Sequence, residues 1–271
     1  MLECCTMKIT FLGTGADDWD WRNPAPGTRK STCTLVGATV LVDAGPCVLA
    51  GLADAGARPA RVADLLVTHT HGDHFNPDAV MAIAGAGRRK LRVWGPPTVA
   101  DMLPGGLARV DFHPLLPGDG FRVAGMRAVA LPANHAVAPR SAEQPLHYAI
   151  SGRGANLLYA LDGGWLCAKA RLWLGEFLRG KPLDAIVWDA TCGNTFRDWR
   201  FAEHNDLRMI DAMREGLVKL GIASAETLHV FDHVARTLWP ADAAEHRRLA
   251  ECFGGMVAED GLELDVNEPA R

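Results

Sequence analysis

Short apolar runs, separated by glycine and polar residues, recur along the whole chain. Runs of this length, rich in β-branched residues and bounded by turn residues, predict β-strands. The Ala124-Gly125 step inside one longer run predicts the turn of a hairpin. The predicted strands are residues 9–12, 34–36, 39–42, 65–68, 91–94, 157–161, 185–188 and 228–231, and the predicted hairpin is residues 121–131.

Three segments between these strands predict α-helices. Asn76 is a suitable N-cap and Pro77 a suitable first residue for a helix over residues 77–86. A second helix over residues 168–179 would end at Gly180. The third, over residues 206–220, has an apolar face made of Leu207, Ile210, Met213, Leu217 and Leu220. The length of 271 residues and the apolar composition predict one domain with a large sheet core around these elements.

Four of the apolar runs lead into residues that can bind a metal. The strand at 65–68 leads to His69, the hairpin leads to His135, the run 157–161 leads to Asp162, and the last strand leads to His233. Each of these residues taken alone could be structural. Their shared placement favours a common site, because the ends of several strands can meet at one edge of a sheet.

The densest group of such residues is the heptapeptide 68–74, Thr-His-Thr-His-Gly-Asp-His. His69 and His71 would project to the same face if the strand continues through them. Asp73 and His74 follow in the strand-to-helix turn and would approach the same space from another side. Neutral imidazoles and carboxylates are standard ligands of zinc and similar ions, so these two ligand sets predict two metals.

The composition, with 48% hydrophobic and 22% charged residues, fits one domain over residues 1–271, in which residues 1–6 form a tail that we expect to be disordered. The net charge of -4 and the pI near 6.2 count against nonspecific nucleic-acid binding. No apolar stretch approaches the ~20 residues of a membrane-spanning helix, and no signal peptide is visible, so we expect a cytoplasmic protein. The seven cysteines lack zinc-ribbon spacing and are expected to be thiols without a chemical role.

His204 differs from the remaining histidines because it lies at the start of the helix predicted over residues 206–220. The N–H groups at a helix start favour an anion, which would place His204 beside a substrate phosphate. A structural role at the helix start is an equally open alternative. We expect the other four histidines to be structural or surface residues: His113, His147, His229 and His246.

The heptapeptide 68–74 and the residues around it resemble the metallo-β-lactamase superfamily over nearly the whole chain. The resemblance is carried by the heptapeptide with Asp43-Ala44-Gly45 before it and with His135, Asp162 and His233 after it. It implies a four-layer αββα sandwich. It also implies that one metal is held by His69, His71 and His135, that a second is held by Asp73, His74 and His233, and that Asp162 bridges them.

A closer likeness narrows the family. Asn134-His135, residues 158–162, residues 185–191 and His204-Asn205-Asp206-Leu207 resemble the phosphoribosyl 1,2-cyclic phosphate phosphodiesterases, in which the histidine matching His204 assists phosphodiester cleavage. The cysteine cluster of that family's additional structural zinc is absent from residues 13–31, and Arg236 stands where its histidine is expected. We therefore expect no structural zinc. The segment 13–31 is long for a connection between neighbouring strands, and we expect it to form part of the pocket wall.

The resemblance implies a dinuclear hydrolase that cleaves a small phosphorylated substrate, such as a cyclic nucleotide or sugar-phosphate diester. Two divalent ions, zinc or manganese with iron as a further candidate, would activate a bridging water. Asp73 would orient this water, and His204 would protonate the leaving oxygen. The candidates for binding a second phosphate are Arg140, Arg197 and Arg200. The alternative for each is a solvated charge on the surface.

Three other functions stay open at this point. A lactonase or thioesterase would use the same metals to hydrolyse a C–O or C–S bond. A ribonuclease Z-like RNA-processing enzyme is the second, because such enzymes share the motif. The negative net charge and the lack of a recognisable basic insertion for tRNA binding count against nucleic acid as a partner. A metal-dependent binding module without activity is disfavoured because all seven ligands and His204 are present. The sequence also leaves open whether two copies pair as a homodimer.

Overall fold

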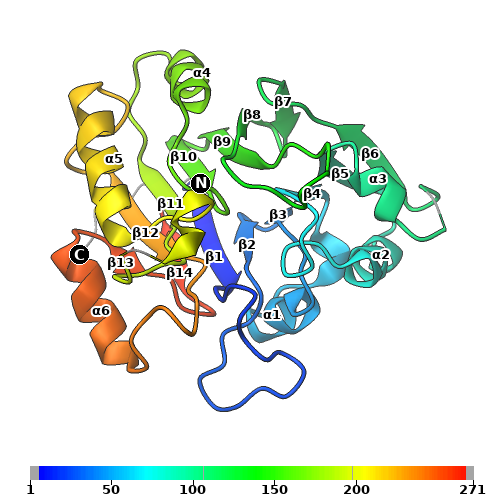
Figure 1. Cartoon of the computed structure of the whole chain (residues 1–271). Coiled ribbons are helices and arrows are strands. Elements are labelled where there is room, and N and C mark those ends of the chain that lie inside the picture. Colours follow the sequence, from blue (N-terminus) through cyan, green and yellow to red (C-terminus); the bar gives the residue numbers. More distant parts are fainter. Residues whose placement is uncertain (1–5, 106, 197, 267–271) are drawn as a thin grey trace.

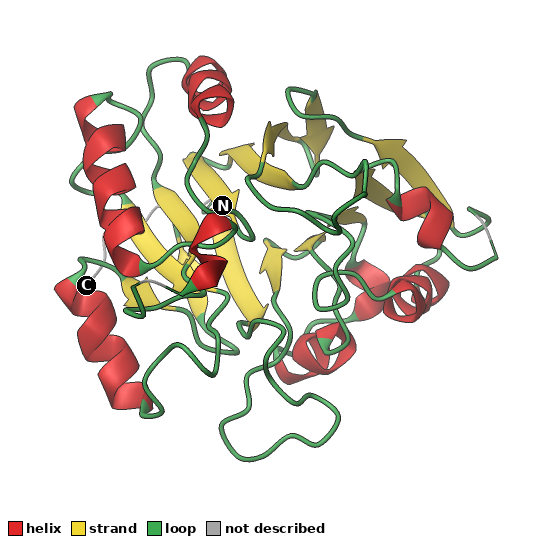
Figure 2. Cartoon of the chain, viewed as in Figure 1, coloured by secondary structure: helices red, strands yellow, loops and turns green. Residues whose placement is uncertain are grey.

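The computed structural model describes residues 6–105, 107–196 and 198–266. Within these residues the strands form two sheets that face each other, and helices cover the outer side of each (Figures 1 and 2). Both sheets are mixed, with antiparallel strands at one end and parallel strands at the other.

The first sheet has the strand order β14-β1-β2-β3-β4-β5-β6. Strands β3 to β6 run parallel, so their carboxyl ends lie at one edge. The strands are β1 (Lys8–Gly13), β2 (Cys33–Val36), β3 (Val40–Val42), β4 (Asp64–Leu66), β5 (Leu91–Gly95), β6 (Val110–Pro114) and β14 (Glu263–Asp265). Its outer face is covered by α1 (Val48–Asp54), α2 (Pro77–Ala86) and α3 (Val99–Met102), with the 3-10 turn η1 (Pro59–Arg61) beside them (Figure 1).

The second sheet has the order β13-β12-β11-β10-β9-β8-β7. Strands β10 to β13 are parallel, and β8 runs in the same direction as β10 because both are antiparallel to β9. The strands are β7 (Gly120–Val123), β8 (Met126–Pro132), β9 (Leu146–Gly152), β10 (Ala155–Ala160), β11 (Ala185–Asp189), β12 (Leu228–Asp232) and β13 (Met256–Val257). Its outer face is covered by α4 (Ala168–Leu178), α5 (Leu207–Lys219) and α6 (Ala243–Cys252), and the 3-10 turn η2 (Trp199–Ala202) precedes α5.

Three apolar cores separate the four layers. Phe11 and Leu66 of the first sheet pack with Tyr159 of the second in the central core. The strands alternate between cores, since successive side chains point to opposite faces: Leu65 packs with the helices α1 to α3, and Leu66 packs in the centre. Both faces of each sheet are therefore buried, which explains the continuous apolar runs of the sequence. The predicted αββα sandwich is confirmed.

Most predicted elements form close to their predicted bounds, with two differences. The strand at 65–68 ends at Leu66, so His69 and His71 lie on loop backbone and not on a strand. Helix α5 ends at Lys219, and Leu220 is 55% exposed because it caps the helix and does not extend the apolar face. The proposed tail falls largely on residues 1–5, which lie outside the described residues, and the Thr6 hydroxyl donates a hydrogen bond to Asp265.

Candidate metal centre and active site

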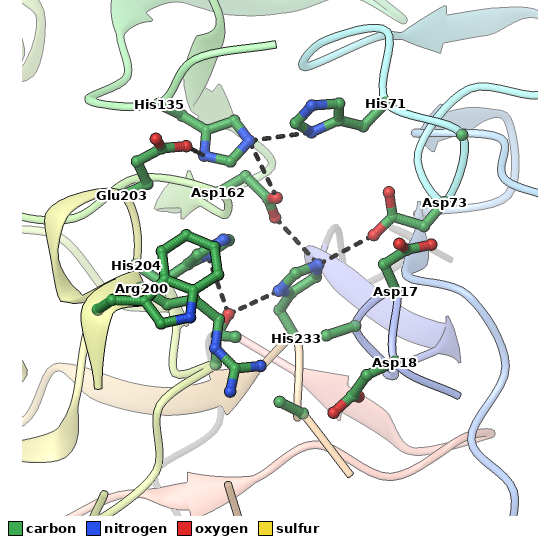
Figure 3. Close-up of a pocket in the computed structure, with 15 residues that line it drawn as sticks. Asp17, Asp18, His71, Asp73, His135, Asp162, Arg200, Glu203, His204 and His233 are labelled. Carbon is green, nitrogen blue, oxygen red and sulfur yellow. Dashed lines mark hydrogen bonds and ion pairs between the residues drawn. The ribbon is translucent and has the colours of Figure 1, made fainter. Parts of the chain in front are cut away.

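The predicted metal ligands lie at the carboxyl ends of strands from both sheets. His69, His71, Asp73 and His74 follow β4 of the first sheet, and the other three follow strands of the second sheet. Those three are His135 after β8, Asp162 after β10 and His233 after β12. The structure gathers the donor atoms of all seven into two neighbouring groups. Five of the seven line one cavity: His71, Asp73, His135, Asp162 and His233 (Figure 3).

The first group of donor atoms consists of three imidazoles and one carboxylate. His71 Nδ1 lies 3.0 Å from Nε2 of His69 and 3.0 Å from Nε2 of His135. His71 Nε2 donates a hydrogen bond to the carbonyl of Val137, which leaves Nδ1 free to act as a ligand. Oδ2 of Asp162 lies 3.6 Å from His135 Nε2 and completes the group.

The second group contains Asp73, His74 and His233. Nε2 of His74 and Nε2 of His233 lie 3.1 Å apart, and each lies 3.3 Å from Oδ2 of Asp73. Oδ1 of Asp162 lies 3.1 Å from both imidazoles. The two oxygens of Asp162 thus face different groups, which is the arrangement of a bridging carboxylate.

The donor set fits divalent metals. A tetrahedral ion with bonds of about 2.0–2.1 Å holds its ligands roughly 3.3 Å apart, close to the distances within both groups. Asp162 Oδ1 is buried and accepts no hydrogen bond from any described residue, although a buried carboxylate oxygen needs a partner. Without metal, burial opposes the charged form of Asp162, but His233 and His74 outweigh it and hold its pKa well below the usual value.

A second layer of hydrogen bonds fixes the imidazole rings. Nδ1 of His74 donates to Asp43, which also accepts from the backbone N–H and the hydroxyl of Thr68. Nδ1 of His233 bonds the hydroxyl of Thr191 at 2.7 Å. These bonds select the tautomer in which Nε2 is free for a metal. Position 45 can hold only glycine, because a Cβ there would lie 1.9 Å from the carbonyl oxygen of Asp73.

His204 lines the same cavity and lies just before helix α5, as the sequence predicts. The helix start is capped by Asp206, whose side chain accepts from two backbone N–H groups, and α5 begins only at Leu207. His204 lies two residues before this cap, and its Nδ1 is 2.8 Å from the buried Asp189 carboxylate. Nε2 is therefore the ring nitrogen left to meet a substrate.

The charge on His204 is set mainly by Asp189. Burial opposes the imidazolium form, but the Asp189 carboxylate outweighs this effect and raises the pKa of His204 to about 9. Burial also opposes the ionised form of Asp189, and His204 reverses this effect and lowers its pKa to about 2. Both shifts favour the ion pair, in which the imidazolium of His204 donates a hydrogen bond from Nδ1 to the Asp189 carboxylate. Asp189 was not singled out from the sequence, although it ends an apolar strand in the same way as the ligand-bearing strands do.

The cavity has a volume of about 360 Å³. Besides metal ligands and His204, its walls include Asp17 and Asp18 of the β1–β2 loop, with Trp199, Arg200 and Glu203 of the segment before α5. The loop thus forms part of the wall, as predicted. Arg200 lines the cavity, but its side chain is paired with Asp198.

The other candidate arginines differ from Arg200. Arg140 is exposed and does not line the cavity, which favours its reading as surface charge. Arg197 lies outside the described residues.

The β1–β2 loop is tied to the segment after β12 through Asp18. The Asp18 carboxylate accepts hydrogen bonds from the backbone N–H groups of Arg236 and Thr237 and from the Thr237 hydroxyl. Arg236 also donates from Nε to the Asp18 carbonyl. These hydrogen bonds anchor the loop without a thiolate ligand. The expected lack of a structural zinc stays a prediction.

The four histidines expected to be structural lie outside the cavity lining. His147 and His229 are buried in β9 and β12, and His246 is buried in α6 beside Arg29. His113 stacks on Trp94.

Comparisons with known proteins identify the family of this chain. The sequence model of the beta-lactamase superfamily domain matches residues 38–229. The chain is similar to ribonuclease Z of Methanothermobacter thermautotrophicus, with 27% identity over 146 residues, which are 48% of this chain and 45% of that protein. A ribonuclease Z of Methanococcus maripaludis is 32% identical over 102 residues, 36% of this chain and 32% of that protein. The matches thus span less than half the length of these curated relatives.

Two solved structures share the fold over almost the whole chain. A diphosphatase of the PhnP family has a TM-score of 0.70 and 18% identity, and the match covers 95% of this chain and 96% of that one. Human short-form tRNase Z has a TM-score of 0.71 and 18% identity, covering 97% and 100%. None of the described helices is long and apolar enough to cross a membrane. With most of its length matched by the family model, the chain belongs to the metallo-β-lactamase superfamily of metal-dependent hydrolases.

Proposed function

We propose that the protein is a dinuclear phosphodiesterase that acts on a small phosphorylated substrate. The observation that carries the proposal is the His204–Asp189 pair, in which Nδ1 of His204 lies 2.8 Å from a buried carboxylate and the ring lines the cavity beside members of both metal groups. An alkoxide leaves phosphorus slowly unless it is protonated, so a positioned proton donor suits this reaction. A thiolate needs no such help, which counts against a thioesterase.

The residues that would hold the metals follow from the two groups. His69, His71 and His135 would hold one ion, and Asp73, His74 and His233 the other, with Asp162 between them. Zinc and manganese both suit imidazole and carboxylate ligands. When bound, two such ions neutralise the nonbridging phosphate oxygens and lower the pKa of a water between them.

The protein's own groups complete the reaction. Asp73 lines the cavity, and its carboxylate can orient the attacking water by accepting a hydrogen bond from it. His204 donates the proton on Nε2 to the leaving oxygen, while Asp189 holds Nδ1–H and keeps the ring in place. Attack and departure would then occur on opposite sides of phosphorus, with Asp73 and His204 as their respective partners.

A ribonuclease Z-like activity is the second candidate, because the curated relatives are ribonucleases Z and human tRNase Z shares the fold. Two observations favour the small substrate. The net charge of -4 gives no general attraction for RNA. The cavity of about 360 Å³ is near the lower end of the range for small-molecule sites. The fold shared with the PhnP-family diphosphatase is consistent with this choice.

The experiment that tests the proposal is His204→Ala in the metal-loaded enzyme. For an unactivated phosphodiester, kcat should fall by roughly 10²- to 10⁴-fold, the usual effect of losing a general acid. The loss should be smaller with a nitrophenyl diester, because nitrophenolate needs little protonation. Both metals should stay bound, as measured by elemental analysis. His113→Ala removes an imidazole outside the cavity lining and is the matched control.

A substrate panel separates the alternatives. Cyclic and aryl phosphodiesters, lactones, thioesters and a precursor tRNA would be offered to the same preparation. Turnover of lactones without phosphodiesters, or processing of the tRNA at rates above those of all small diesters, would contradict the proposal. So would full activity of His204→Ala on an unactivated diester.

A further inference from the structure

The rim of the cavity beside His204 carries an exposed aromatic turn. Trp199 is 76% exposed and is the most exposed large apolar side chain of the described residues, and Phe201 on the same turn is 52% exposed. A single exposed apolar residue needs no explanation. Trp199 differs because it also lines the cavity that holds both metal groups, whereas Phe201 does not.

The backbone of this turn is fixed. The Asp198 side chain caps η2 by accepting from the backbone N–H of Arg200, and it also binds the Arg200 guanidinium through Nε at 2.7 Å. The carbonyl of Arg200 accepts from the backbone N–H of His204 at 2.8 Å. The backbone that carries Trp199 thus belongs to the same hydrogen-bonded segment as His204, so a ligand that covers the indole ring need not order this backbone.

The turn and His204 line the same cavity. His204 lies close to both metal groups, since its ring centroid is 5.1 Å from that of His135 and 5.6 Å from that of His233. Figure 3 shows His204, Arg200 and Glu203 together on one side of the cavity, apart from Asp73. In the function proposed above His204 meets the leaving oxygen, so a group attached to that oxygen would lie toward the cavity wall that Trp199, Arg200 and Glu203 share with His204. An indole face accepts flat rings of many kinds, since stacking depends on the ring face and not on a specific hydrogen bond.

We propose that Trp199 stacks on a planar ring in the leaving group, so that the substrate is a phosphodiester that carries a nucleobase or a similar flat ring. The inference rests on the phosphodiesterase function proposed above and adds the class of its leaving group. The cavity of about 360 Å³ accommodates one such nucleotide-sized group.

Binding without turnover tests the stacking role. Adenosine 5′-monophosphate and ribose 5-phosphate differ by the base alone, and their affinities for the metal-loaded protein can be measured by calorimetry. Trp199→Ala should weaken binding of the nucleotide by roughly 5- to 150-fold and leave ribose 5-phosphate unchanged. Trp199→Phe should retain most of the affinity. Phe201→Ala, from the same turn but not from the cavity lining, should bind both ligands like the unmodified protein.

Steady-state kinetics give a second readout. For a ring-bearing diester, Trp199→Ala should raise KM and leave kcat nearly unchanged, because stacking contributes equally in the ground and transition states. Equal nucleotide affinity in Trp199→Ala and Phe201→Ala would overturn the proposal and leave Trp199 as an exposed surface residue or a contact for another protein. If the unmodified enzyme hydrolyses no phosphodiester, the function proposed above fails instead, and the binding comparison still decides the role of Trp199.

Discussion

Asp189 controls the protonation of His204, and its replacement should shift the pH profile of the enzyme. His204 is active as the imidazolium, so kcat should fall as the pH rises through its pKa, which is about 9 next to Asp189. Asp189→Asn removes the negative charge that favours the imidazolium, so the pKa falls and the alkaline limb should move to lower pH. Bound cations lower this pKa in both enzymes, so the difference between the two kcat–pH profiles is the measurement. Coincident alkaline limbs would exclude Asp189 from this role.

Individual residues were predictable where their chemistry and spacing are unusual in the sequence. The heptapeptide and the strand ends indicated all seven residues that the structure gathers around the cavity. Asp189 was missed because its role depends on the position of His204, which follows it after a turn that no local pattern encodes. Trp199 was missed for a related reason, since exposure and cavity lining are properties of the folded chain.

Elements with strong local signals were predicted best. The hairpin turns at Ala124 and Gly125, both with positive φ, and Asn76 caps α2 through its side chain. Helix α1 was not predicted because it has only seven residues and no side-chain cap at Cys47. The edge strands β13 and β14 were also missed, since their two and three residues form only by pairing with distant strands.

The loop between β8 and β9 supports the histidine heptapeptide through Glu143. Its carboxylate accepts hydrogen bonds from the backbone N–H and the hydroxyl of Thr70 and from the hydroxyl of Thr98. Glu143→Ala should weaken metal binding by roughly 10- to 100-fold, the usual effect of removing a support of the ligands. Competition with a chromophoric chelator measures this change. Thr98→Val removes one of the three bonds and should have a smaller effect, and an unchanged affinity in Glu143→Ala would show that the loop holds its shape alone.

The pairing of β11 with β12 makes stability depend on a neutral histidine. Trp188 donates its indole N–H to Nδ1 of His229, and burial, followed by the charge of Arg214, lowers the pKa of His229 to about 4. The unfolded chain takes up this proton near pH 6.5 and the folded chain only near pH 4, so stability is lost as the pH falls between these values. His229→Gln keeps an acceptor but does not titrate.

This variant should show a shallower loss of stability on acidification. One proton changes the slope of the free energy of unfolding against pH by about 1.4 kcal/mol per pH unit. This is the largest reduction in slope that His229→Gln can produce. Urea unfolding of both proteins at a series of pH values gives the slopes. Equal slopes would mean that another group accounts for the acid sensitivity of this part of the sheet.

The metal groups connect the two halves of the molecule. Ligands after β4 belong to the first sheet, and Asp162 and His233 belong to the second, so bound metals would tie the edges of both sheets together. Asp43, Asp162 and His233 all have positive φ, between 51° and 60°, which is strained backbone for these residues. The same edge is therefore the part of the fold that gains most from ligand binding.

Metal removal should consequently destabilise the whole chain and not only the site. Each ion present at 100 to 1,000 times its Kd stabilises the folded state by about 3–4 kcal/mol, so removal of both ions by chelation should lower Tm by on the order of 20 °C. Asp162→Ala should bind fewer than two ions per chain and show a smaller drop on chelation. Asp211→Ala, which removes an exposed carboxylate of α5, is the control. Elemental analysis in metal-supplemented buffer measures the number of ions per chain. One ion or fewer in the unmodified protein would contradict the dinuclear site. Unchanged metal content in Asp162→Ala would exclude a bridging role for Asp162, whatever the change in Tm.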